Sequence, residues 1–81
     1  MPITVKLFAA YQEAVQQPEL HLDLPAGTTV AQVRDRLIEA HPELAQWREV
    51  TRFGVNYEFV APETVLQAGD ELVLIPPVSG G

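Results

Sequence analysis

The chain has 81 residues, an apolar fraction of 47%, a charged fraction of 20% and a formal net charge of −6. A chain this short folds as one domain with a modest core and has little room for a deep catalytic cavity. It contains no cysteine, which excludes a disulfide framework, a thiolate metal site and a cysteine nucleophile. Its five basic residues do not cluster in the sequence, so nucleic-acid binding is not expected.

The distribution of apolar residues indicates no membrane segment. The longest uncharged and mostly apolar run, residues 72–78, is far shorter than the about 20 residues that a membrane-spanning helix needs. The first residues lack the basic start and the long apolar stretch of a signal peptide. We therefore expect a cytoplasmic protein that does not associate with membranes. Its acidic charge either favours a basic partner surface or only aids solubility.

The N-terminal part of the chain predicts two strands joined by a short helical segment. Apolar and polar residues alternate over 3–8, which is the pattern of a half-buried strand. Residues 9–17 fit a short helical turn that ends at Pro18. Leucines then alternate with polar residues over 19–24, so a second strand is expected there.

The middle of the chain predicts the main helix. Thr29 and Gln32 have the spacing of a capping box, in which each side chain bonds to the backbone of the other residue. Apolar residues follow at helical spacing over 30–40. Pro42 disfavours helical geometry at the residue before it, so the helix is expected to end at about residue 40. Residues 42–48 are expected to add a short turn.

The C-terminal part predicts short strands and one long final strand. Residues 50–55 and 59–60 are strand candidates joined by a tight turn at 56–58, since asparagine at the start of the turn tolerates a positive φ. Gly69-Asp70 is a turn signal before the run 72–75, which is apolar on both sides. This last segment is therefore expected to lie inside the sheet.

Together these elements predict an α+β fold of the ubiquitin-like β-grasp type. The first two strands pair antiparallel, the final strand lies parallel to the first at the centre of a mixed sheet, and one main helix covers one face. Residues 1–75 form this domain, and residues 76–81 form an extended, flexible C-terminal tail. We find no internal repeat, low-complexity segment or internal linker in the sequence.

The sequence offers no self-contained active site and no metal site. His21 and Asp23 share one strand face, but a metal needs at least three or four ligands, so the pair is interpreted as a solvated surface. Asp35 and Glu39 lie four residues apart on the predicted helix and are interpreted as an exposed acidic face. Ser79 is the only serine and has no histidine nearby in the sequence, so nucleophilic catalysis is not indicated.

The C-terminal tail is the part of the sequence that can take part in chemistry. Pro76-Pro77 fixes two φ angles and favours an extended exit from the sheet. Val78-Ser79 continues the tail. Gly80-Gly81 lacks Cβ atoms, so the end can enter a channel scarcely wider than a peptide backbone. The terminal carboxylate can itself be a substrate, because ATP can adenylate it and a nucleophile can then attack the acyl adenylate.

A second feature is an apolar surface on the far side of the sheet. If Leu72 and Leu74 face the main helix, the alternate side chains of the last strand face away from it. A monomer rarely exposes several large apolar groups on an open sheet face without a partner. The alternatives are that a loop covers them or that the strand register differs by one residue. We call this surface the outer face, and its predicted members are Phe8, Phe59, Val73 and Ile75.

The residues described so far resemble a known family over nearly the whole chain. Val5-Lys6-Leu7-Phe8-Ala9 is similar to the first strand of MoaD-type proteins. Gly54-Val55-Asn56 and the run 66–75 are similar to the family's Val-Asn turn and Gly-Asp-Glu turn. The most specific part is the ending Pro76-Pro77-Val78-Ser79-Gly80-Gly81, which looks like the family's Pro-Pro-Val-(Ser/Thr)-Gly-Gly terminus. Tyr57 departs from the pattern, since many β-grasp hairpins place glycine there.

The resemblance implies a sulfur carrier that is the small subunit of molybdopterin synthase, with a ubiquitin-like fold. An activating enzyme of the MoeB type would adenylate Gly81 with ATP and magnesium, and sulfur transfer would make Gly81 a thiocarboxylate. This thiocarboxylate would donate sulfur to a cyclic pterin precursor during molybdenum cofactor biosynthesis. The chain itself would bind no cofactor and would act as the sulfur-donating subunit of a transferase complex.

The resemblance also implies two protein partners. One is the MoeB-type adenylating enzyme, and the other is the MoaE-type large subunit, which accepts the tail in a heterotetramer of two small and two large subunits. Docking would use the outer face together with the tail. The residues implied in binding are Phe8, Phe59, Val73, Ile75, Pro76, Pro77, Val78 and Ser79, with Gly80 and Gly81 entering the partner's active site.

Three alternatives stay open at the level of the sequence. The chain could be a related carrier for thiamine synthesis or tRNA thiolation, with the same chemistry at Gly81 and a different acceptor. It could be a ubiquitin-like protein modifier that joins target lysines through Gly81. Its only lysine is Lys6, which argues against long self-linked chains. It could also be an interaction module whose tail is inert.

Overall fold

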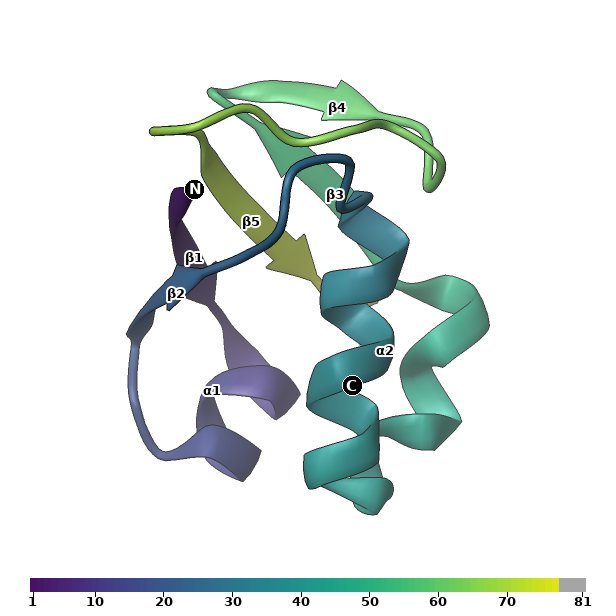
Figure 1. Cartoon of the computed structure of the whole chain (residues 1–81). Coiled ribbons are helices and arrows are strands. Elements are labelled where there is room, and N and C mark those ends of the chain that lie inside the picture. The colour runs from purple at the N-terminus through teal and green to yellow at the C-terminus, as the bar shows by residue number, and fades with distance from the viewer. Residues whose placement is uncertain (78–81) are drawn as a thin grey trace.

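The first and last strands of the chain lie side by side at the centre of one mixed sheet. In the computed structural model, which describes residues 1–77, β1 (Pro2–Leu7) runs parallel to β5 (Glu71–Ile75). β2 (Glu19–Asp23) pairs antiparallel with the other edge of β1. β3 (Arg52–Val55) pairs antiparallel with β5, and β4 (Glu58–Val60) completes the order β2-β1-β5-β3-β4 (Figure 1). The predicted β-grasp topology is confirmed.

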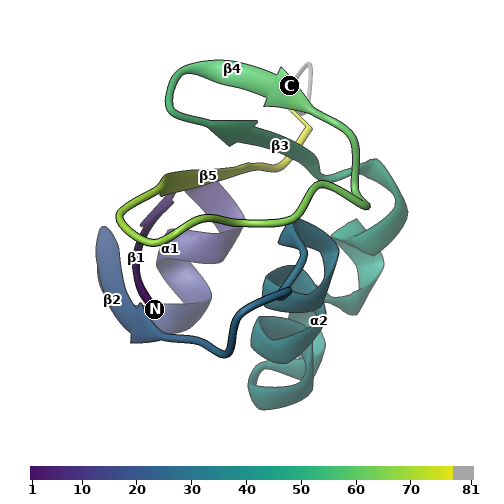
Figure 2. The ribbon, with the colours of Figure 1, turned by 45° about the horizontal axis from the view of Figure 1, so that its top comes forward.

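Three helical segments lie on one side of this sheet. They are α1 (Ala9–Val15), α2 (Val30–Ala40) and the 3-10 helix η1 (Pro42–Val50). Figure 2 shows the sheet curving around α1 and α2. Residues 1–77 contain no helix that combines the length and the apolar character needed to cross a membrane.

The main helix begins and ends where local chemistry sets its limits. The Gln32 backbone N–H donates to Thr29 Oγ1 over 3.2 Å, and the Thr29 backbone N–H donates to Gln32 Oε1 over 2.9 Å. This reciprocal pair satisfies two N–H groups that the first helical turn leaves without a partner. The helix ends at Ala40, because Pro42 disfavours helical geometry at His41. Both predicted ends of α2 are confirmed.

The segment after α2 is longer than the short turn predicted for 42–48. It forms η1 up to Val50, and β3 therefore starts at Arg52 instead of residue 50. Pro42 stands in the first turn of η1, where its missing N–H costs nothing. At the other end, the Thr51 hydroxyl donates to the Trp47 carbonyl over 2.7 Å and satisfies one of the last carbonyls of η1.

The core lies between the sheet and the helices. Central strand residues alternate strictly, with Val5, Leu72 and Leu74 fully buried, as the sequence pattern predicts. Leu20, Leu22 and Leu24 of the second predicted strand contribute to the same core. The buried apolar side chains are Ile3, Val5, Leu7, Tyr11, Leu24, Val30, Val33, Leu37, Leu44, Phe53, Leu66, Leu72 and Leu74.

The β3–β4 hairpin closes through the predicted turn. Asn56 and Tyr57 have φ values of 50° and 72°, the left-handed conformation that two-residue hairpin turns require at both central positions. Asn56 also bonds across to the loop before β5: its Nδ2 donates to Asp70 Oδ1 over 2.9 Å, and its Oδ1 accepts from the Glu71 N–H over 3.0 Å. The asparagine thus joins two turns at the same end of the sheet.

Candidate functional site

The C-terminal tail leaves the sheet from its central strand. β5 is hydrogen-bonded on both edges, to β1 and to β3. Its last residue, Ile75, pairs with Arg52, the first residue of β3. The next residue, Pro76, is buried, and Pro77 is exposed. The start of the tail therefore has a fixed position on the domain, set by strand pairing and by the burial of Pro76.

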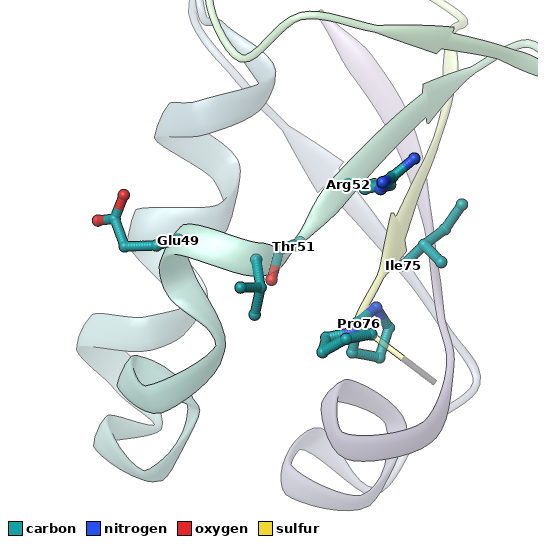
Figure 3. Close-up of a pocket in the computed structure, with 7 residues that line it drawn as sticks. Glu49, Thr51, Arg52, Ile75 and Pro76 are labelled. Atoms are coloured by element: carbon teal, nitrogen blue, oxygen red, sulfur yellow. The ribbon is translucent and has the colours of Figure 1, made fainter. Parts of the chain in front are cut away.

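An open groove lies beside this exit point. It has a volume of about 610 Å³ and runs between the end of η1 and the end of β5. In the close-up, Arg52 and Ile75 project from neighbouring strands, and Pro76 lies below Ile75 where β5 ends (Figure 3). The lining residues are Glu49, Val50, Thr51, Arg52, Ile75, Pro76 and Pro77.

The outer face is built from the side chains of the sheet that point away from the helices. Strand pairing places Lys6 next to Val73, Val73 next to Gly54, and Gly54 next to Phe59. Val73 is half-buried between buried neighbours, which confirms the predicted strand register. Phe59 is 74% exposed on the edge strand β4. In residues 1–77 no loop covers this phenylalanine.

Phe8 reaches the same face from the end of β1. The sequence pattern predicted Phe8 as part of the first strand. In the structure β1 stops at Leu7, and Phe8 is the N-cap residue of α1. Its φ of −132° and ψ of 155° are extended, so the alternation of the strand continues through it and its side chain points outward. It is 49% exposed. Because Leu7 pairs with Leu74, Phe8 continues the row toward Ile75.

Gly54 sits in the middle of the outer face. A Cβ at this position would lie 3.8 Å from Val73 Cβ and 3.7 Å from the Glu58 carbonyl oxygen, which are ordinary contact distances. Gly54 itself is buried, so the neighbouring side chains and not the β3 backbone form the surface here. The absence of a side chain makes this part of the face flat, a shape that suits the approach of another protein surface.

Charged groups around the outer face are few. Lys6 Nζ lies 3.9 Å from Glu71 Oε1, a distance at the limit of an ion pair. Arg52 has no carboxylate oxygen within 4.0 Å among residues 1–77. It lines both the groove beside Pro76 and a smaller one, of about 290 Å³, that includes Phe59. Arg52 was not among the site residues predicted from the sequence, because only the pairing of β3 with β5 places it beside the tail.

The weaker candidates from the sequence do not assemble into a site. His21 Nε2 lies 2.9 Å from Glu19 Oε2, whereas Asp23 Oδ1 accepts from the N-terminal amino group over 2.9 Å, so the two do not act together. Asp35 accepts from Arg34 and Arg48. Within the described part of the chain no three histidine, aspartate or glutamate side chains are placed to hold a metal.

The predicted tail residues Val78, Ser79, Gly80 and Gly81 lie outside the described residues. The described part supplies a rigid base, a groove at that base and an apolar face beside it. A chain end held this way can be presented to the active site of another protein.

Comparison with known proteins places the chain in a family. The model of the ThiS family matches residues 5–81. The molybdopterin synthase sulfur carrier subunit of Arabidopsis thaliana is 37% identical over 79 residues, which is 98% of this chain and 82% of that protein. The protein of the same name from Mycobacterium tuberculosis is 36% identical over 81 residues, covering 98% of this chain and 96% of that protein.

A solved structure supports the same assignment. The crystal structure of SAMP1 from Haloferax volcanii aligns over 100% of both chains with a TM-score of 0.82 and 32% sequence identity. The small archaeal modifier protein 1 of that organism is 36% identical over 88 residues, covering 94% of this chain and 97% of that protein. The family match spans almost the whole domain and its tail, and the full-length relatives exceed 30% identity. The chain therefore belongs to the ThiS family of ubiquitin-like β-grasp proteins.

Proposed function

We propose that this protein is the sulfur carrier subunit of a molybdopterin synthase and that its chain end carries the sulfur. The observation that carries the proposal is the exit of the tail: β5 is paired on both edges, Pro76 is buried, and the Gly-Gly terminus follows four residues beyond it. A terminus of this kind can enter a partner's active site while the domain docks outside. Similarity to sulfur carrier subunits of about the same length supports the assignment.

The proposed chemistry takes place at the carboxylate of Gly81 in two steps. The carboxylate oxygen attacks the α-phosphorus of ATP, forming an acyl adenylate and releasing pyrophosphate. A sulfur nucleophile then attacks the acyl carbon and AMP leaves, which yields the thiocarboxylate. Glycine at the last two positions leaves the acyl carbon open to this attack because it has no Cβ. In this proposal ATP and magnesium belong to the activating enzyme.

Two partners follow from this proposal. The activating enzyme, of the MoeB type, takes the tail first. The large synthase subunit, of the MoaE type, takes the thiocarboxylate and transfers its sulfur to the cyclic pterin precursor in a heterotetramer with two copies of each subunit. The outer face supports this proposal, since its members Phe59 and Phe8 are 74% and 49% exposed. Exposed apolar groups gathered on one sheet face are typical of a protein interface.

The test is the intact mass of the chain after incubation with a MoeB-type enzyme, ATP, magnesium and sulfide. We expect a mass increase that equals the exchange of one oxygen for one sulfur. The increase should be absent without ATP and absent from a variant that lacks Gly81. An unchanged mass, with an enzyme proven active on its own carrier, would contradict the proposal.

A second function has one specific observation in its favour. The chain is 36% identical to a protein named small archaeal modifier protein 1. In that role the activated Gly81 would be attacked by the amino group of a target lysine, forming an isopeptide bond with loss of AMP. Isopeptide-linked adducts in cells that express the chain would support this function. A carrier role in thiamine synthesis or tRNA thiolation is a different alternative. It would be indicated if the chain is activated but does not bind the large subunit.

A further inference from the structure

Arg52 on the outer face forms no ion pair with the described residues of the domain. The protein has five lysine and arginine side chains and a net charge of −6. Arg34 and Arg48 both contact the carboxylate of Asp35, at 3.0 Å and 3.2 Å. Lys6 lies 3.9 Å from Glu71. Arg52 and Arg36 have no carboxylate within 4.0 Å in the described part of the chain, and only Arg52 lies beside the tail.

The position of Arg52 is set by strands and not by a loop. It is the first residue of β3 and pairs with Ile75, the last residue of β5 before the tail. It is exposed and lines the grooves on both sides of β3, one with Ile75 and Pro77 and the other with Phe59. A guanidinium group on a rigid strand and among apolar side chains is placed to meet an opposite charge at a defined point.

We infer that Arg52 is the charged anchor of the outer face and pairs with a carboxylate on the large synthase subunit. The inference rests on the proposed function. The fitting partner surface is apolar, to cover Phe59 and Ile75, and carries one aspartate or glutamate opposite Arg52. The guanidinium fork can hold that carboxylate with two parallel hydrogen bonds.

Charge complementarity favours this partner chemistry over others. The acidic domain as a whole is attracted to a basic surface, and that attraction alone fixes no orientation. Arg52 pairs with the last strand residue before the tail and reverses the sign of the charge there, so the orientation that brings a partner carboxylate onto Arg52 also brings the tail toward the active site. Wrong orientations would place like charges together, which is costly. Arg52 would therefore set the register in which the tail is inserted.

The experiment measures binding of the full chain to the large synthase subunit encoded by the same genome. Arg52→Glu is compared with Arg36→Glu, which makes the same change in net charge on α2, away from the tail. We expect Arg52→Glu to weaken binding by about 10-fold or more and Arg36→Glu to change it by less than about twofold. Melting temperatures of both variants should match the wild type, since neither side chain is buried.

A charge exchange identifies the partner group. Each acidic residue on the large subunit is replaced by arginine, and the replacement opposite Arg52 should restore binding to Arg52→Glu while weakening binding to the wild-type chain. Equal affinities of Arg52→Glu and Arg36→Glu would overturn the inference and leave the proposed function intact. Failure of the wild-type chain to bind the large subunit or to gain sulfur would overturn both.

Discussion

The hydroxyl group of Tyr11 lies 2.6 Å from the hydroxyl oxygen of Thr51, and the tyrosine is fully buried. Thr51 donates its own proton to the Trp47 carbonyl over 2.7 Å, so the Tyr11 hydroxyl is the donor to Thr51. The two bonds connect α1, the end of η1 and the start of β3. Thr51 also lines the groove beside Pro76, so this buried chain of hydrogen bonds supports the place where the tail leaves the domain.

Replacing Tyr11 by phenylalanine should lower the free energy of unfolding by about 1–2 kcal/mol, because Thr51 Oγ1 loses a buried donor. Urea denaturation measures the change. Tyr57→Phe is the matched control, since Tyr57 is 89% exposed and its hydroxyl should contribute nothing measurable. Equal stability of the wild type and Tyr11→Phe would show that the buried hydrogen bond has no net value.

The same hydroxyl predicts a loss of stability at high pH. Burial raises the pKa of Tyr11 above its usual value of about 10, and the positive charge of Arg34 opposes that rise. The unfolded chain therefore releases this proton at lower pH than the folded protein does. The contribution to stability is complete below about pH 10 and is lost as the pH rises from there through the folded pKa.

The measurement for this effect is the unfolding free energy of the wild type and of Tyr11→Phe between pH 8 and 11. Groups other than Tyr11 titrate in both proteins, so the difference between them isolates Tyr11. We expect the stability advantage of the wild type to shrink above about pH 10. A difference that stays constant with pH would contradict the direction of the pKa shift.

The hairpin turn should gain stability from glycine at Tyr57. Tyr57 has a φ of 72°, a conformation in which an L side chain is strained and glycine is not. Tyr57→Gly should raise the free energy of unfolding by about 0.5–1 kcal/mol. Asn56→Gly is the contrasting variant: it also relieves a positive φ but removes the side-chain bonds to Asp70 and Glu71, so it should destabilise. Thermal unfolding distinguishes the two.

Ile75→Lys should weaken binding to the large subunit more than it lowers stability. Ile75 lies on the outer face at the end of β5 and is only half-buried, so a lysine can keep its charge in water when the protein is free. Docking would then bury an unpaired charge, and we expect at least a 10-fold loss of affinity. Leu74→Lys, at a fully buried neighbour, should instead prevent folding. A large fall in the melting temperature of Ile75→Lys, with binding to the large subunit intact, would contradict this prediction.

The local patterns of the sequence determined most of the fold. Period-two alternation predicted which residues of β1, β2 and β5 face the core, because adjacent strand side chains necessarily point to opposite sides. The Thr29–Gln32 capping box and Pro42 predicted both ends of α2, because these signals act within one or two turns of the backbone. The Gly-Gly terminus suggested the reactive end that we propose, because its chemistry depends on the residues themselves and not on their neighbours in space.

Tertiary structure alone decided how distant residues meet around that end. Tyr11 and Thr51 are 40 residues apart and no local pattern links them, yet packing of α1 against η1 brings their hydroxyls together. In the sequence Arg52 is one of five basic residues that do not cluster, and only its pairing with Ile75 places it beside the tail. Pro76 reads as the start of a free tail, but the fold buries it. Each of these depends on contacts between segments far apart in the chain, which composition and periodicity do not encode.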